Sequence, residues 1–218
     1  QSDFTDRYAA RIYLRGEIQT REKNWHDFFQ LITWHAFPNT KKTINARHYS
    51  AAKRRFDTEG NSGRRSDTEN LLSLFDECGA VVVSDDASLL DLIRGFKWKT
   101  LFHERRHDLA DHLQCIVFGH AMLEKMFDPY IGITANAVLL NVSEQYFALS
   151  PAQKLQQLDI SIADRIDAKE GRESLLKPRD LSPLPLLGFP SYWRGNDNAE
   201  FYDNLEYFRP GRREHVLC

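Results

Sequence analysis

The sequence predicts a mainly helical protein with at most a small β element and an irregular C-terminal tail. Helix-capping signals recur along the first three quarters of the chain, and apolar residues there repeat at helical spacing. Five of the eight prolines lie beyond residue 169, which sets the tail apart. We therefore expect one domain over residues 1–218, with a helical body at 1–168 and a wrapping tail at 169–218.

Three helices are predicted before residue 60. Apolar side chains in residues 3–15 have helical spacing, and Gly16 can end that helix in the left-handed conformation. Asn24 can cap a second helix, because its side chain can accept a hydrogen bond from a free backbone amide. Pro38 ends this helix, and a third helix is predicted at residues 40–56.

The strongest local signal is the S-D-T-E sequence that begins at Ser66. It matches a capping box, in which the Ser66 hydroxyl and the Glu69 carboxylate each bind a free backbone amide. The box predicts a helix that ends at Gly79, and a flexible loop is predicted before it at residues 60–63.

The segment at residues 80–84 is the one convincing strand candidate, because it is short and rich in β-branched valine. Asp85 or Asp86 can cap the helix that follows, and this helix is predicted to end at Gly95.

Three further helices are predicted in the second half of the chain. Apolar residues of 108–127 fall on one stripe of helical period, which predicts a long core helix. Another helix is predicted from Gly132 to about residue 147. Ser150 and Gln153 form a second capping box with a proline at the first helical position, which predicts an amphipathic helix behind them.

The tail beyond residue 169 combines prolines with many aromatic residues. Disordered segments are poor in aromatic residues, so we expect this tail to be irregular in structure but packed on the helical body.

The composition is that of an ordinary globular domain, with 42% hydrophobic residues, 28% charged residues and a net charge of -2. The apolar runs are far shorter than the roughly 20 residues that span a bilayer, so we expect no membrane partner. Three scattered cysteines do not form a disulfide framework, and a cytoplasmic protein is expected.

The basic residues concentrate between residues 41 and 65, where eight of them face two acidic residues, a local charge of +6. Such a segment predicts either binding of a phosphate-containing or other anionic ligand, or a solvated helix that faces acidic neighbours. The sequence contains no phosphate-binding loop, dinucleotide-binding turn, nucleophile elbow or known nucleic-acid module. The candidate binding residues are Lys41, Lys42, Arg47, His48, Arg64 and Arg65.

His120 lies within the apolar stripe of the predicted 108–127 helix, and Glu124 follows one turn later. Two interpretations stay open. The pair is either a core histidine with its hydrogen-bonding partner, or a catalytic acid–base or metal-binding pair.

His26 and Asp27 belong to the first turn of the helix that Asn24 caps, where free amides favour anions. Capping explains Asp27, and a surface histidine needs no explanation. His48 lies on the apolar side of the third helix. The candidate catalytic residues are thus His120, Glu124, His26 and Asp27, and the candidate ligands of a divalent metal are His120, Glu124 and His48.

Asp76 and Glu77 lie at the predicted end of the helix that Ser66 caps. Paired acids can bind a hard cation or divide acid and base roles, but such a pair is more often solvated surface. We therefore interpret them as surface residues.

The stretch with His103, Glu104 and His107 is formally the H-E-x-x-H motif of zinc metalloproteases. Two arginines separate Glu104 from His107, and His112 comes five residues after His107 rather than the six of the metzincin pattern. A charged turn between two helices is therefore favoured, and a zinc protease is a minor alternative.

Several uncommon motifs are spread over nearly the whole chain. They include Asn24-Trp25-His26-Asp27-Phe28-Phe29, Asn45-Ala46-Arg47-His48, Leu74-Phe75-Asp76-Glu77-Cys78-Gly79, Phe118-Gly119-His120-Ala121, Pro183-Leu184-Pro185-Leu186-Leu187-Gly188 and Phe201-Tyr202-Asp203-Asn204. On these motifs the sequence resembles the bacterial proteins grouped as domain-of-unknown-function family 3025. The resemblance implies a bacterial, cytoplasmic protein that forms a single unit with an integral tail, and it assigns no reaction to any residue.

Two classes of function stay open. The first is a hydrolase with a His/Glu site, which acts on a phosphate-containing substrate and uses either a divalent metal or acid–base chemistry. The second is a non-enzymatic scaffold that binds nucleic acid or an acidic partner through residues 41–65.

Overall fold

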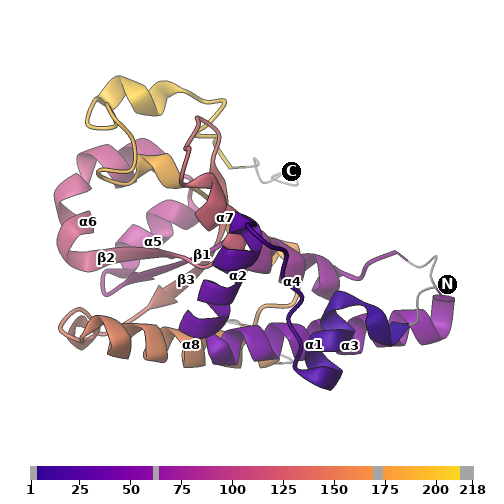
Figure 1. Ribbon diagram of the computed structural model, residues 1–218. Coiled ribbons are helices and arrows are strands. Elements are labelled where there is room, and N and C mark those ends of the chain that lie inside the picture. The colour runs from indigo at the N-terminus through magenta and orange to yellow at the C-terminus, as the bar shows by residue number, and fades with distance from the viewer. Residues whose placement is uncertain (1–3, 61–63, 169–173, 212–218) are drawn as a thin grey trace, which may run out of the picture. The chain divides into compact units, whose positions relative to one another are not determined.

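The computed structural model describes residues 4–60, 64–168 and 174–211 (Figure 1). The chain forms two compact units, and neither is continuous in sequence. The first comprises Gln1–Gly79, Val117–Phe127 and Leu149–Leu181, and the second comprises Ala80–Ile116, Asp128–Ala148 and Ser182–Cys218. The expected single domain over 1–218 stays a prediction.

The first unit is a bundle of helices in which α3 is the longest. This helix packs against α1, α4 and α8, and α2 packs against both α3 and α7. The helices are α1 (Tyr8–Arg15), α2 (Trp25–Ala36), α3 (Pro38–Glu59), α4 (Asp67–Cys78), α7 (His120–Lys125) and α8 (Pro151–Asp167), with 3-10 turns at Phe4–Asp6 and Pro178–Asp180.

The capping signals are confirmed in this unit. The Asn24 side chain accepts a hydrogen bond from the Asp27 amide at the start of α2, and Ser66 and Ser150 each form a complete capping box. Gly16 ends α1 with a φ of 70°. Side-chain capping therefore fixes where three of these six helices begin, namely α2, α4 and α8.

The second unit contains a four-stranded sheet with the strand order β2-β1-β3-β4. Its strands are β1 (Gly79–Ser84), β2 (Leu113–Val117), β3 (Thr134–Asn141) and β4 (Ser182–Pro185). Gly79, the first residue of β1, and Val117, the last residue of β2, belong to the first unit. β3 and β4 are antiparallel, with Thr134 opposite Pro185 and Ala137 opposite Ser182. The predicted strand at residues 80–84 is confirmed as β1, which is buried throughout.

Helical segments complete the second unit. The helix α5 (Ala87–Arg94) is capped by Asp86, whose side chain accepts a hydrogen bond from the Ser88 amide. This helix packs against β3 and β4. A short π-helix (Thr100–Glu104) and α6 (Arg106–His112) follow it.

The prediction of one long helix at residues 108–127 is wrong. The segment forms the end of α6, then β2, and then α7, which begins at His120. Leu113, Ile116 and Val117 are apolar and partly β-branched, so they fit a strand as well as a helix, and pairing with the neighbouring β1 decides between the two.

The prediction of a helix at residues 132–147 is also wrong. Residues Thr134–Asn141 form β3, and only a 3-10 turn at Glu144–Tyr146 is helical. β3 pairs with β4, which lies more than 40 residues later in the chain, so its partner could not be read from the local sequence.

The C-terminal residues form β4 and short 3-10 turns, and their aromatic side chains pack within the second unit. Phe102 lies against Phe189, Tyr202 and Phe208, and the Trp98 indole donates a hydrogen bond to the carbonyl of Arg209. Their burial agrees with an ordered segment, and the predicted wrap over the helical body stays a prediction.

Some predictions fall outside the described residues. These are the loop at 61–63, the first residues of the tail at 169–173, and Cys218. Among the helices that the structure describes, none is long and apolar enough to cross a bilayer.

Candidate functional site

A cavity of about 600 Å³ lies in the first unit, with α3 and α4 as two of its walls. The lining positions recur every three or four residues along each helix, as expected for one helical face. From α3 they are Lys41, Ile44, Asn45, His48, Tyr49, Ala52 and Arg55, and from α4 they are Glu69, Leu72, Ser73, Asp76 and Glu77. The volume is that of a pocket for a small organic ligand.

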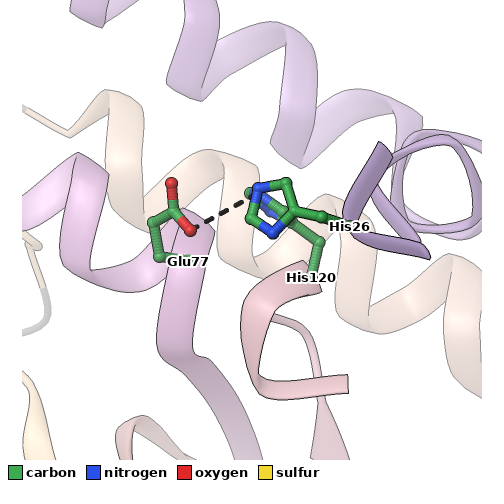
Figure 2. Close-up of side chains that lie close together, drawn as sticks. All are labelled: His26, Glu77 and His120. Carbon is green, nitrogen blue, oxygen red and sulfur yellow. Dashed lines mark hydrogen bonds and ion pairs between the residues drawn. The ribbon is translucent and has the colours of Figure 1, made fainter. Parts of the chain in front are cut away.

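Two histidines and a glutamate meet in the wall of this cavity. His26 comes from α2, Glu77 from α4 and His120 from α7, and Figure 2 shows the three side chains pointing toward one another. The His120 Nε2 atom lies 3.1 Å from Nε2 of His26 and 3.5 Å from a Glu77 carboxylate oxygen. Among the described residues, this is the group of three side chains whose geometry suits a metal ion.

The position of His120 depends on a close backbone contact made by Gly119. The amides of Phe118 and Gly119 both donate to the carbonyl of Gly79, at 3.0 and 2.8 Å. A Cβ atom on Gly119 would lie 2.4 Å from the carbonyl oxygen of Glu77. Only glycine fits there, and the contact places the start of α7 directly beside the end of α4.

His26 is positioned by the start of α2. The Asp27 carboxylate accepts hydrogen bonds from the backbone amide of Arg21 and from two nitrogens of its guanidinium, at 2.6 to 3.0 Å. These hydrogen bonds from Arg21 lower the pKa of Asp27 from 3.8 to about 2. Asp27 therefore lines the cavity as a fully bonded carboxylate that holds the first turn of α2.

A second carboxylate stands behind each imidazole. The Nδ1 atom of His26 lies 3.2 Å from a carboxylate oxygen of Glu124, and Nδ1 of His120 lies 4.0 Å from one of Asp76. The other Asp76 oxygen accepts a hydrogen bond from the buried ammonium group of Lys41. The two rings are therefore flanked by acids on their outer sides, and their Nε2 atoms face each other.

His120 is 1% exposed, and burial lowers its pKa below the ordinary value. Its ring is therefore neutral near pH 7. The Nδ1 atom is buried and has no hydrogen-bond partner in the described part of the chain. The buried Nδ1 atoms of His48 and His103 also have no hydrogen-bond partner in the described part of the chain, so this feature is not specific to the cluster.

The structure brings together most of the histidine and acid candidates. His26 and His120 meet, and Glu124 contacts His26. His48 lines the same cavity, but its Nε2 atom faces the Ser73 hydroxyl at 3.2 Å and it lies outside the metal-type cluster. Burial lowers the pKa of His48 as well.

Some basic residues of the 41–65 segment line the cavity, and others lie outside it. Lys41 and Arg55 turn into the cavity, where each pairs with an acid of α4. Arg65 also lines the cavity, whereas Lys42 and Arg64 are exposed on the surface. Arg47, the remaining candidate binding residue of this segment, is half-buried and does not line the cavity.

Asp76 and Glu77 contact the cluster, although the sequence alone suggested that both are solvated surface residues. Glu77 is half-exposed, yet it contacts His120, and Asp76 pairs with Lys41. Their position at the end of a capped helix was visible in the sequence. The contact with Gly119, some 40 residues later, was not. Arg21 was missed for the same reason, since only the folded chain shows its bonds to Asp27.

The H-E-x-x-H stretch does not lie on one helix. His103 belongs to the π-helix that ends at Glu104, and His107 belongs to α6, with Arg105 between them at φ -97° and ψ 20°. The two-histidine face that a zinc protease requires is therefore interrupted, and we do not propose that function.

The fold and the cavity define a mainly helical protein with a small sheet and a histidine–carboxylate cluster in its first unit. The chain belongs to the family described as "Protein of unknown function (DUF3025)", whose model matches residues 1–212. The resemblance seen in the sequence is thereby confirmed. Comparison with curated proteins and with solved structures finds no match.

Replacing Gly119 with alanine should disrupt the contact between α7 and α4. The added Cβ overlaps the backbone at Glu77, and overpacking of this kind costs about 1–3 kcal/mol of unfolding free energy. Urea unfolding of the purified variant measures the loss. Gly95→Ala is the matched comparison with a milder contact, 3.1 Å to the nearest backbone oxygen, and it should lower the urea midpoint less than Gly119→Ala does. An unchanged urea midpoint for Gly119→Ala would contradict this account.

The Arg21–Asp27 contact should stabilise the protein in a pH-dependent way. Because the folded state lowers the pKa of Asp27 to about 2, the stabilisation is present above pH 3.8 and is lost as the pH falls toward 2. The unfolding free energies of wild type and Arg21→Gln should therefore differ at pH 6, and the difference should shrink below pH 3.8 and become small only near pH 2. Chemical denaturation across this range is the measurement. A difference that stays constant with pH would show that the contact does not perturb Asp27.

Proposed function

We propose that the protein is a hydrolase that acts on a small phosphate-containing molecule bound in the cavity between α3 and α4. The observation that carries this proposal is the convergence of His26, Glu77 and His120 in the cavity wall. Side chains that can activate a water molecule thus line a cavity large enough for a small ligand.

The charges around the cavity support an anionic substrate. Five cationic side chains face four acidic ones, and three of the acids are engaged in ion pairs with cations of the same wall. The fourth acid, Glu77, contacts His120. The balance of the lining therefore favours an anion, and phosphate oxygens accept hydrogen bonds from such groups. The cations are Arg7, Arg21, Lys41, Arg55 and Arg65.

The cluster is suited to supply the attacking water. The carboxylate of Glu124 can accept a hydrogen from Nδ1 of His26, and the Nε2 atom that faces His120 then serves as the base. In the reaction, the water oxygen forms a bond to phosphorus and the bond from phosphorus to the leaving oxygen breaks. The proton that the water loses ends on that leaving oxygen.

The alternative is a scaffold that binds nucleic acid or an acidic partner through residues 41–65. The exposed Lys42, Arg54 and Arg64 are the residues that would serve this role. Lys41 and Arg55 are not available for it, because they pair with acids inside the cavity wall. This pairing leaves fewer cations of residues 41–65 for a nucleic acid or an acidic partner, which counts against the scaffold.

We also propose that the protein is bacterial and cytoplasmic. The family resemblance supports the bacterial source. Cys78 and Cys115, the cysteines within the described residues, are both free, as expected in a reducing compartment.

Assays with small phosphate esters should reveal turnover that depends on the cluster. We expect wild type to release phosphate from at least one compound in a panel of nucleoside monophosphates, sugar phosphates and p-nitrophenyl phosphate. His120→Ala should lower kcat/KM by about 100-fold or more, because it removes a group that activates water. His35→Ala is the matched control, since His35 is exposed on the same helix as His26 and lies outside the cluster.

The hydrolase proposal fails if no compound in the panel is turned over, or if His120→Ala and His35→Ala have equal activity. Retention on heparin that falls steeply with salt and depends on Lys42 and Arg64 would instead support the scaffold.

A further inference from the structure

We propose that His26, His120 and Glu77 hold one divalent transition-metal ion, with zinc the ion best suited to the hydrolysis proposed above. This inference rests on the proposed function for its chemistry and on the geometry of the cluster for its existence. The ligand atoms are Nε2 of each histidine and a carboxylate oxygen of Glu77.

The two imidazole nitrogens have the separation of ligands that share an ion. Two nitrogens that each lie 2.0–2.1 Å from one zinc ion are about 2.9 to 3.4 Å apart, for bond angles between octahedral and tetrahedral. The two Nε2 atoms are 3.1 Å apart, within this range. The Glu77 oxygen lies slightly farther away, at 3.5 Å from Nε2 of His120, and all three ligand atoms lie within 4.8 Å of one another. Because the Glu77 side chain is half-exposed, it is free to rotate toward an ion held by the two nitrogens.

The Nδ1 atoms of both rings are placed as they are in metal-binding histidines. A histidine that binds a metal through Nε2 carries its ring hydrogen on Nδ1. Nδ1 of His26 lies 3.2 Å from a Glu124 carboxylate oxygen, and Nδ1 of His120 is on the side of Asp76. Both Nε2 atoms, which face each other at 3.1 Å, are then available to one ion.

The outer acids match the usual surroundings of a metal site. Histidine ligands commonly donate their second ring N–H to a carboxylate, which fixes the ring and makes the ligand atom more basic. Glu124 stands in this position for His26, at 3.2 Å. Asp76 is the carboxylate on the corresponding side of His120, at 4.0 Å, which is longer than a hydrogen bond. Lys41 holds Asp76 in place through its buried ammonium group.

The three ligands leave room for a substrate or water on the ion. All three side chains line the cavity, and the side chains of His26 and Glu77 are 30% and 50% exposed. Three protein ligands with an open position are typical of catalytic zinc, whereas structural zinc has four. A bound zinc ion lowers the pKa of its water to about 7, which supplies hydroxide for attack on phosphorus at neutral pH.

Metal titration of the purified full chain tests this site without any substrate. After treatment with chelator and removal of the chelator, wild type should bind one equivalent of Zn²⁺ by calorimetry and should give the visible spectrum of a nitrogen–oxygen site with Co²⁺. His26→Ala, His120→Ala and Glu77→Gln should each weaken Zn²⁺ binding by at least about 100-fold, and Glu124→Gln by about 10- to 100-fold.

His35→Ala is the control for ions held by exposed histidines, and it should bind as wild type does. Glu77→Gln keeps the shape of a half-exposed side chain, so it tests the site even if His120→Ala does not fold. The inference is overturned if wild type binds less than one equivalent, or if Glu77→Gln and His26→Ala bind with wild-type affinity.

The titration separates this inference from the hydrolase proposal. If wild type binds one equivalent of Zn²⁺ through these residues but hydrolyses no phosphate ester, the metal site is supported and the hydrolase proposal is wrong. If wild type hydrolyses phosphate esters in the presence of chelator, the hydrolase proposal is supported and the metal site is wrong.

Discussion

The close contact between Gly119 and the backbone at the end of α4 is the constraint on which the candidate site depends. Two amide hydrogen bonds to the Gly79 carbonyl hold this contact, and no side chain fits between the two backbones. Because α7 begins at the next residue, His120 is held beside Asp76 and Glu77. The cluster is thus built on three helix ends, the starts of α2 and α7 and the end of α4, and helices are rigid elements suited to hold a site.

Paired charges surround the cluster and hold its members in place. The Lys41–Asp76 and Arg55–Glu69 pairs link α3 to α4, and the Arg21–Asp27 pair holds the start of α2. The Lys41–Asp76 and Arg55–Glu69 pairs are buried, and buried pairs contribute little net stability, because desolvation offsets their attraction. We interpret the value of these two pairs as geometric, since each fixes a carboxylate that lines the cavity.

Sequence patterns predicted much of the helical unit but little of the sheet. Capping at Asn24, Ser66 and Ser150 depends on contacts within four residues, so it could be read directly. The strands β2 and β3 were mistaken for helices, because their assignment depends on pairing with distant segments. The same limit applied to the site. His26 was a candidate because it lies in the first turn of a capped helix, and His120 because it lies among apolar residues of helical spacing. In the structure those apolar residues belong to α6, β2 and α7 and not to one continuous helix.

We infer above that two imidazoles and a carboxylate from three helices form a single metal site. The most direct test of this site is an anomalous difference map from crystals grown with Zn²⁺ or Co²⁺, recorded on both sides of the metal absorption edge. We predict one peak about 2.0–2.2 Å from Nε2 of His26, Nε2 of His120 and a Glu77 oxygen. A map with no peak among these three side chains, while exposed histidines elsewhere hold the ion, would contradict the account.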